Sequence, residues 1–232
     1  GSLLARDAAD GVLQRSAGRR DVVESRSHQL LEPGGRYIDF LVPGLLGMGL
    51  MGGGLWGVGF AIVDLRIRKL LKRYLATPMR KSHFLGAVML SRLLFTIPEV
   101  VLLLVFSQIF FGVGTQGSYL AVALLILLGA CEFAGIGLLV ASRAQSLETV
   151  SGLMNLVMLP MWIGSGIFFS VERFPDSMQP AIQLLPLTPL IDALRRVMLE
   201  GAGIGSLGFQ LTVIVAWGAV TFALALRWFR WN

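Results

Sequence analysis

Long apolar stretches alternate with short polar ones along most of this chain. A helix of about 20 apolar residues is long enough to cross about 30 Å of hydrocarbon. The first such stretch begins at Leu41 and continues without a charge to Val63. We therefore predict an all-α membrane protein with five transmembrane helices in this chain, at about residues 41–63, 84–113, 119–142, 149–171 and 204–226.

A basic, amphipathic stretch separates the first two predicted spans. Apolar residues recur at helical spacing from Ile67 to Leu75, which predicts a short helix lying flat on the membrane. Thr77 and Pro78 end it, because proline lacks an amide donor and disfavours the helical conformation in the residue before it. The basic residues of this stretch are Arg66, Arg68, Lys69, Lys72 and Arg73.

The distribution of lysine and arginine predicts the orientation of the chain. The 64–82 loop has seven of these residues and the C-terminus has two, whereas the 112–118 turn has none and the 172–203 loop has three against four acidic residues. The positive-inside rule then places the basic stretch and the C-terminus in the cytosol and residues 1–37 outside it. An exported N-terminus without a signal peptide implies a span upstream. We therefore expect six helices in the complete polypeptide.

The two predicted extracytoplasmic segments differ in character. Residues 1–37 are polar, and either pack on a domain upstream or form a mobile tail. The 172–203 loop predicts short amphipathic helices before the last span, one of them from Pro189 to Gly201. There Asp192 with Arg196, and Arg196 with Glu200, have supporting i,i+4 spacing. Such a helix could cap an exit path or rest among the lipid headgroups.

The composition agrees with a membrane protein and excludes several kinds of chemistry. Mean hydropathy is +0.72, and 15% of residues are charged. The single cysteine, Cys131, excludes an internal disulfide and a zinc site built on several cysteines. No lysine follows a glycine, so the phosphate-binding loop G-x-x-x-x-G-K-[ST] is absent, as are G-x-S-x-G and H-E-x-x-H. We expect no catalytic residue, metal or cofactor on this chain, and no nucleic-acid partner.

Three ionisable residues lie within the predicted spans, where an unpaired charge is costly. Arg92 and Glu132 occur at similar depth on consecutive antiparallel helices, so we predict that they pair. Glu99 follows Arg92 by seven residues beside Pro98, and could join this network or line a pathway. The network is either structural or a path for substrate or protons.

Small residues recur every four positions in the first span, at Gly49, Gly53, Gly57 and Ala61. Such a stripe lets a second helix approach closely. The second helix belongs either to this chain or to a second copy across a dimer seam.

The order of these features resembles the permease subunit of type-2 ABC exporters, over about residues 37–230. The matching segments are Tyr37–Gly44, Leu75–Pro78, Asn155–Pro160 with Gly164–Gly166, and Pro186–Arg195. The chain departs from the family pattern in lacking the first span, and in having Ser170-Val171 where members often have a proline. The resemblance implies a permease domain over residues 38–232, in which two short helices before the last span re-enter the outer leaflet.

The same resemblance implies a subunit of an ATP-driven exporter in the cell inner membrane. Two permease subunits, identical or paralogous, would form the pathway, and separate ATPase subunits holding ATP and Mg would move the helix from Arg66 to Thr77. The polar face of that helix would meet an acidic or hydrogen-bonding groove on the ATPase, or anionic lipid. The alternatives are a stand-alone ion-coupled transporter using Glu99 and Glu132, and a scaffolding subunit.

Overall fold

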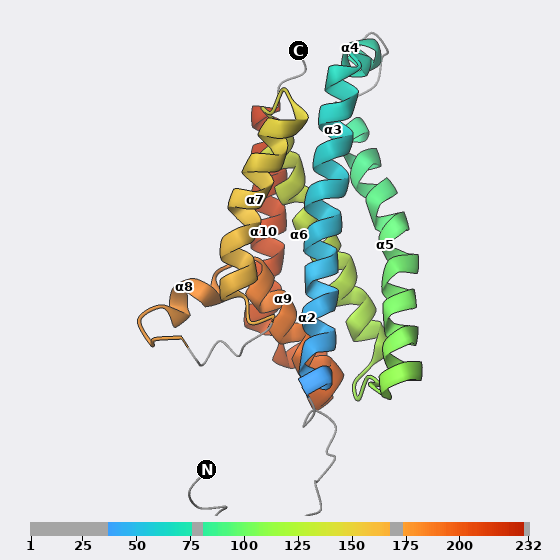
Figure 1. The fold of residues 1–232 in the computed structure, drawn as a ribbon, viewed down its shortest axis with the longest axis vertical. Coiled ribbons are helices and arrows are strands. Elements are labelled where there is room, and N and C mark those ends of the chain that lie inside the picture. Colours follow the sequence, from blue (N-terminus) through green and yellow to red (C-terminus); the bar gives the residue numbers. More distant parts are fainter. Residues whose placement is uncertain (1–36, 76–80, 168–173, 230–232) are drawn as a thin grey trace, which may run out of the picture. The chain divides into compact units, whose positions relative to one another are not determined.

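The computed structural model describes residues 37–75, 81–167 and 174–229 of the 232-residue chain (Figure 1). Five helices in these ranges are long and apolar enough to cross a membrane, as predicted. The chain is therefore a multi-pass, all-helical membrane protein. The predicted N-terminal segment 1–37 lies outside the described residues except for Tyr37, where the first helix begins.

The first span is one continuous helix built from three segments. These are α2 (Tyr37–Gly52), the π-helical turn η1 (Gly53–Gly57) and α3 (Val58–Ile67). Together they cover 31 residues, or about 46 Å at 1.5 Å per residue. The helix is thus longer than the predicted span 41–63, and extends beyond the hydrocarbon region of a bilayer.

The remaining spans follow the predicted order, and two of their ends differ from the prediction by four residues or more. They are α5 (Lys81–Phe111), α6 (Tyr119–Ala141), α7 (Leu147–Gly164) and α10 (Gly208–Trp228). The α7 helix stops well before the predicted residue 171, because the backbone turns at Gly166, which has a φ of +75°. The α10 helix begins after a 3₁₀ turn, η3 (Ile204–Ser206), and therefore starts four residues later than predicted.

In the described part of the connection between α7 and α10, two shorter α-helices precede η3. They are α8 (Gln179–Gln183) and α9 (Leu187–Glu200), and α9 ends at Gly201 in the left-handed conformation. The α9 helix contacts α2, α6 and α10. Its apolar residues Leu190, Ile191, Leu194, Val197 and Met198 are fully buried, so this helix is embedded in the bundle.

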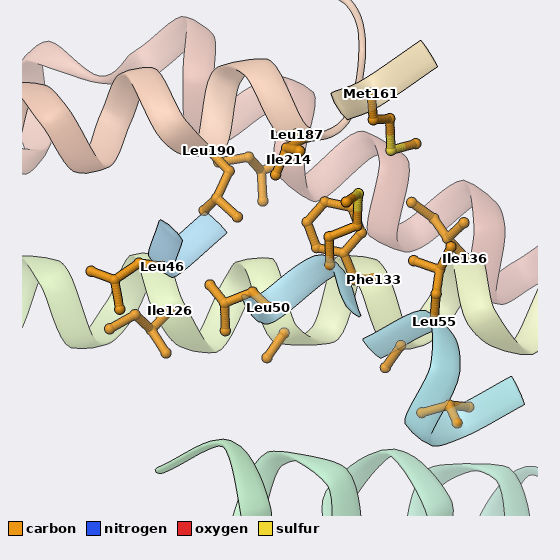
Figure 2. Close-up of a cluster of buried hydrophobic side chains, with 14 of the residues drawn as sticks. Leu46, Leu50, Leu55, Ile126, Phe133, Ile136, Met161, Leu187, Leu190 and Ile214 are labelled. Atoms are coloured by element: carbon orange, nitrogen blue, oxygen red, sulfur yellow. The ribbon is translucent and has the colours of Figure 1, made fainter. Parts of the chain in front are cut away.

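The α6 helix is at the centre of the bundle, and α5 is at its edge. In the most hydrophobic window of α6, 61% of the residues are buried, against 17% in α5. The α6 helix contacts every other span as well as α9. Figure 2 shows Phe133 of α6 among side chains of the first span, including Leu50 and Leu55, with Ile214 of α10 nearby.

Two glycines allow the first span and α6 to touch through their backbones. A Cβ atom added at Gly137 would lie 2.6 Å from the carbonyl oxygen of Gly54 and 3.1 Å from the Cα atom of Leu55. No side chain fits in that space, so this crossing requires glycine on α6. The crossing places the π-helical turn η1 directly against the central helix.

Candidate functional site

The basic stretch after the first span differs from the predicted flat helix of residues 66–77. Arg66 and Ile67 complete α3 instead, and the chain bends at Lys69, which has a φ of +58°. A separate short helix, α4 (Leu70–Leu75), follows the bend. The predicted terminators, Thr77 and Pro78, lie outside the described residues. We refer below to the end of the bundle that carries α4 as the α4 end, and to the opposite end as the α9 end (Figure 1).

Three basic side chains of this stretch are exposed at the α4 end. Arg68 is 67% exposed and forms an ion pair with Asp64, four residues earlier, at 2.9 Å. Lys69 and Arg73 are also exposed, and the side chain of Lys72 lies outside the described part of the chain. Leu71 is buried, which fixes the bend against the bundle. The bend therefore presents positive charge on a short, anchored element.

Arg66 is buried, and the prediction that it lies on the exposed face of the basic helix is wrong. Its guanidinium donates hydrogen bonds to the carbonyls of Ala141 (2.9 Å), Ser142 (3.1 Å) and Ala144. It also lies 5.3 Å from the centre of the Phe229 ring. These carbonyls include those that the end of α6 leaves without a partner in its own helix. A cation there also complements the negative end of the helix dipole.

The Arg66 contacts join three parts of the chain at the α4 end. They connect the last turn of the first span with the turn between α6 and α7, and with the residue that follows α10. Nearby, Arg143 of the same turn lies 5.9 Å from the ring of Trp228. A movement of the bend at Lys69 would therefore act directly on the ends of α6 and α10.

The intramembrane charges pair differently from the prediction. Arg92 forms an ion pair with Glu99 at 2.9 Å on the same helix, and the predicted Arg92–Glu132 pair is absent. Seven residues are two helical turns, about 10 Å, which the long arginine side chain can span. Glu132 is fully buried, and its two carboxyl oxygens have no hydrogen-bond partner among the described residues. Gly218 of α10 packs against the backbone of Glu132, so this side of α6 faces α10 rather than α5.

The predicted glycine stripe of the first span lies against this ion pair. A Cβ atom at Gly53 would overlap the Arg92 guanidinium, one at Gly57 would lie 3.0 Å from Arg92 Cδ, and one at Gly49 would lie 3.5 Å from Glu99 Oε1. The stripe thus faces α5 of the same chain without being fully covered by it, since Gly57 and Ala61 are exposed. The contacts of the three glycines with Arg92 and Glu99 favour internal packing over a dimer seam. A cavity of about 630 Å³ adjoins Arg92 between α3 and α5.

A half-buried arginine, Arg195, which was not among the predicted site residues, joins three parts of the chain at the α9 end. Arg195 of α9 donates to the carbonyls of Gly166 (2.6 Å) and Phe40 (3.3 Å), and its guanidinium lies 3.5 Å from the centre of the Phe40 ring. Burial lowers the pKa of Arg195 to about 10, opposed by the nearby Asp192, so the group stays protonated at neutral pH. In the sequence, Arg195 follows Ile191 by four residues, which places it on the apolar face of the predicted helix. That spacing is the signal that could have identified Arg195 as a packed residue.

Comparison with known proteins identifies the family of the chain. The model of the ABC-2 family transporter protein matches residues 6–227. ABC transporter G family member 20 of Dictyostelium discoideum is 26% identical over 74% of this chain and 24% of its own length. The linearmycin resistance permease protein LnrN of Bacillus subtilis is 24% identical over 73% of this chain and 44% of its own length.

The chain covers a larger share of a third relative than of the first two. The inner membrane transport permease YadH of Escherichia coli is 24% identical over 84% of this chain and 77% of its own length. The chain spans less than half the length of the first curated relatives it matches. Because the family model covers nearly the whole sequence, the chain belongs to the ABC-2 family of transporter proteins.

Proposed function

We propose that this chain is the membrane-spanning permease subunit of an ATP-driven ABC exporter, coupled to a separate ATP-binding subunit. The contacts of Arg66 carry the proposal. An exposed basic bend is linked through this one buried side chain to the ends of two spans, α6 and α10. A partner that pushes or pulls on α4 would therefore act on helices that cross the membrane.

The physical requirement for coupling is a partner that binds α4 differently in its two nucleotide states. A partner with equal affinity for both conformations shifts neither. ATP and Mg are expected on that partner, because this sequence lacks a phosphate-binding loop. The exposed cations at Lys69 and Arg73 suit an acidic or hydrogen-bonding groove on the ATPase.

The basic residues at the α4 end support an orientation of the chain in the membrane. The α4 end carries the basic bend together with Arg143 and Arg227, both of them exposed. We propose that this end lies in the cytosol of the cell inner membrane and that the α9 end faces outward. We also propose a second permease subunit, identical or paralogous, since two copies would be needed to enclose a pathway beside the sparsely buried α5.

An ion-coupled transporter is the alternative function, and the two acidic residues it would use are poorly placed for it. Glu99 is held by Arg92, and Glu132 is closed off from solvent in this conformation. A coupling ion needs access to its carboxylate from each side in turn. The contacts therefore favour a structural role for the ion pair.

Purification from the native membrane in mild detergent, followed by mass spectrometry of bound proteins, tests the proposal. We expect a stoichiometric ATPase with a phosphate-binding loop. The double reversal Lys69→Glu/Arg73→Glu should release it, whereas the matched reversal Arg143→Glu/Arg227→Glu, also at exposed sites of the α4 end, should retain it. Intact preparations of the complete protein without any ATPase would contradict the proposal and direct attention to Glu99 and Glu132.

A further inference from the structure

A polar cavity of about 410 Å³ lies at the α9 end, between α8, α9 and the ends of three spans. Its lining includes Phe40 in the first turn of α2, Ser165 directly after the last residue of α7, and Phe209 and Gln210 in the first turn of α10. The ends of spanning helices lie where the hydrocarbon meets the lipid headgroups. The cavity is therefore at headgroup level.

The charged groups of the cavity come from successive turns of α9. Asp192 accepts a hydrogen bond from the Gln210 amide at 2.7 Å and lies 3.6 Å from Arg196, and Arg195 is occupied with backbone carbonyls. Arg196 is still 42% exposed, so its guanidinium can bind a further anion. Glu200, one turn later, is exposed and has no ion pair within the described part of the chain.

One accessible guanidinium and one unpaired carboxylate, a helical turn apart, suit a ligand that carries both signs of charge. Residues at i and i+4 are neighbours on one face of a helix, so the phosphate and the ammonium group of one zwitterionic phospholipid headgroup can contact the two side chains together. A purely anionic headgroup would leave Glu200 without a partner and would be repelled by it.

An apolar surface continues from the cavity along α10. Phe209, which lines the cavity, is 55% exposed, and Val220, three turns later on the same face, is 53% exposed. Ala216 lies between them and is also exposed. This face runs from headgroup level into the hydrocarbon region, where acyl chains would cover it.

We propose that the cavity binds the headgroup of a zwitterionic phospholipid, with the phosphate against Arg196, the ammonium group against Glu200 and the acyl chains along α10. The site does not depend on the proposed coupling to an ATPase. The bound phospholipid would connect α9 to the start of the last span, α10.

Lipid binding to the purified, delipidated protein tests this site. The probes are short-chain phosphatidylethanolamine, phosphatidylglycerol, diacylglycerol and soluble O-phosphoethanolamine, each titrated by calorimetry in detergent. We expect saturable binding of phosphatidylethanolamine in preference to the other three. Arg196→Gln should weaken it about tenfold, as expected for the loss of one charge-assisted hydrogen bond, and Glu200→Gln should remove the preference over phosphatidylglycerol. Arg227→Gln, the same change at the α4 end, should have no effect.

Three results would overturn the proposal. Equal binding of all three lipids would show that no headgroup is recognised. Binding that is unchanged in Arg196→Gln would place the lipid outside the cavity. Equal affinity for O-phosphoethanolamine and phosphatidylethanolamine would identify a site for a soluble phosphate compound instead. Because Arg196 and Glu200 are both partly exposed, their variants are expected to fold, and a thermal midpoint measured without lipid checks this.

Discussion

Replacing Arg66 by glutamine should destabilise the protein strongly, although the residue lies next to an exposed loop. The side chain donates three hydrogen bonds to carbonyls at the end of α6 and contacts the Phe229 ring. Interhelical hydrogen bonds in membranes average about 0.6 kcal/mol, and bonds to charged groups contribute about 1.5 kcal/mol or more. Three such bonds give a loss of about 2 to 5 kcal/mol in the free energy of unfolding.

Thermal unfolding in detergent measures this loss, with the single thiol of Cys131 as the reporter. At about 2 to 4 °C per kcal/mol for a chain of this size, we expect the midpoint of Arg66→Gln to fall by at least about 4 °C. The midpoint of Arg66→Lys should lie between those of the wild type and Arg66→Gln, because an ammonium group cannot bond several carbonyls in the way that a planar guanidinium does. Arg68→Gln is the matched control, since its exposed pair with Asp64 contributes about 0.5 kcal/mol or less. Equal midpoints for Arg66→Gln and Arg68→Gln would refute the structural role of Arg66.

Three further substitutions test the α9 end and the core. Arg195→Lys should lower the midpoint by several degrees, while Arg196→Lys, at a partly exposed site, should not. Gly137→Ala should reduce the yield of monodisperse protein in gel filtration because its Cβ would meet backbone, whereas Gly152→Ala, with open space around it, should behave as the wild type. Glu132→Gln should fold normally and Glu132→Lys should not, since a buried charge without a partner is costly, and circular dichroism with gel filtration compares the two.

The hydropathy pattern predicted the spans well but not all of their ends. A run of uncharged residues shows that a segment can enter hydrocarbon, but it does not show where the helix stops inside the protein. The apolar run that contains α7 continues past Gly164, yet the chain turns there and packs Ile167 into the core. The residues of a buried turn are as apolar as those of a membrane span, so composition does not distinguish the two.

The charged residues show a second limit of the sequence. Both α3 and the predicted flat helix have a period of 3.6 residues, so the pattern could not locate the bend at Lys69 or the direction of Arg66. The sequence assigned Arg92 and Glu132 to consecutive helices, as the structure has them, but it did not predict the rotation of these residues about the helix axes. That rotation is set by contacts such as the one between Gly218 and Glu132, which pair residues far apart in the chain.

Site-specific photo-crosslinking from α4 tests the central claim most directly. A photoreactive amino acid at Arg73, exposed on α4, should crosslink in native membranes to a protein with a phosphate-binding loop, and the same group at Leu120, exposed at the start of α6, should not. The yield of the Arg73 product should depend on nucleotide, because coupling requires different contacts in the two nucleotide states. Crosslinking from Arg73 to lipid alone, or to the ATPase equally from both positions, would contradict the central claim.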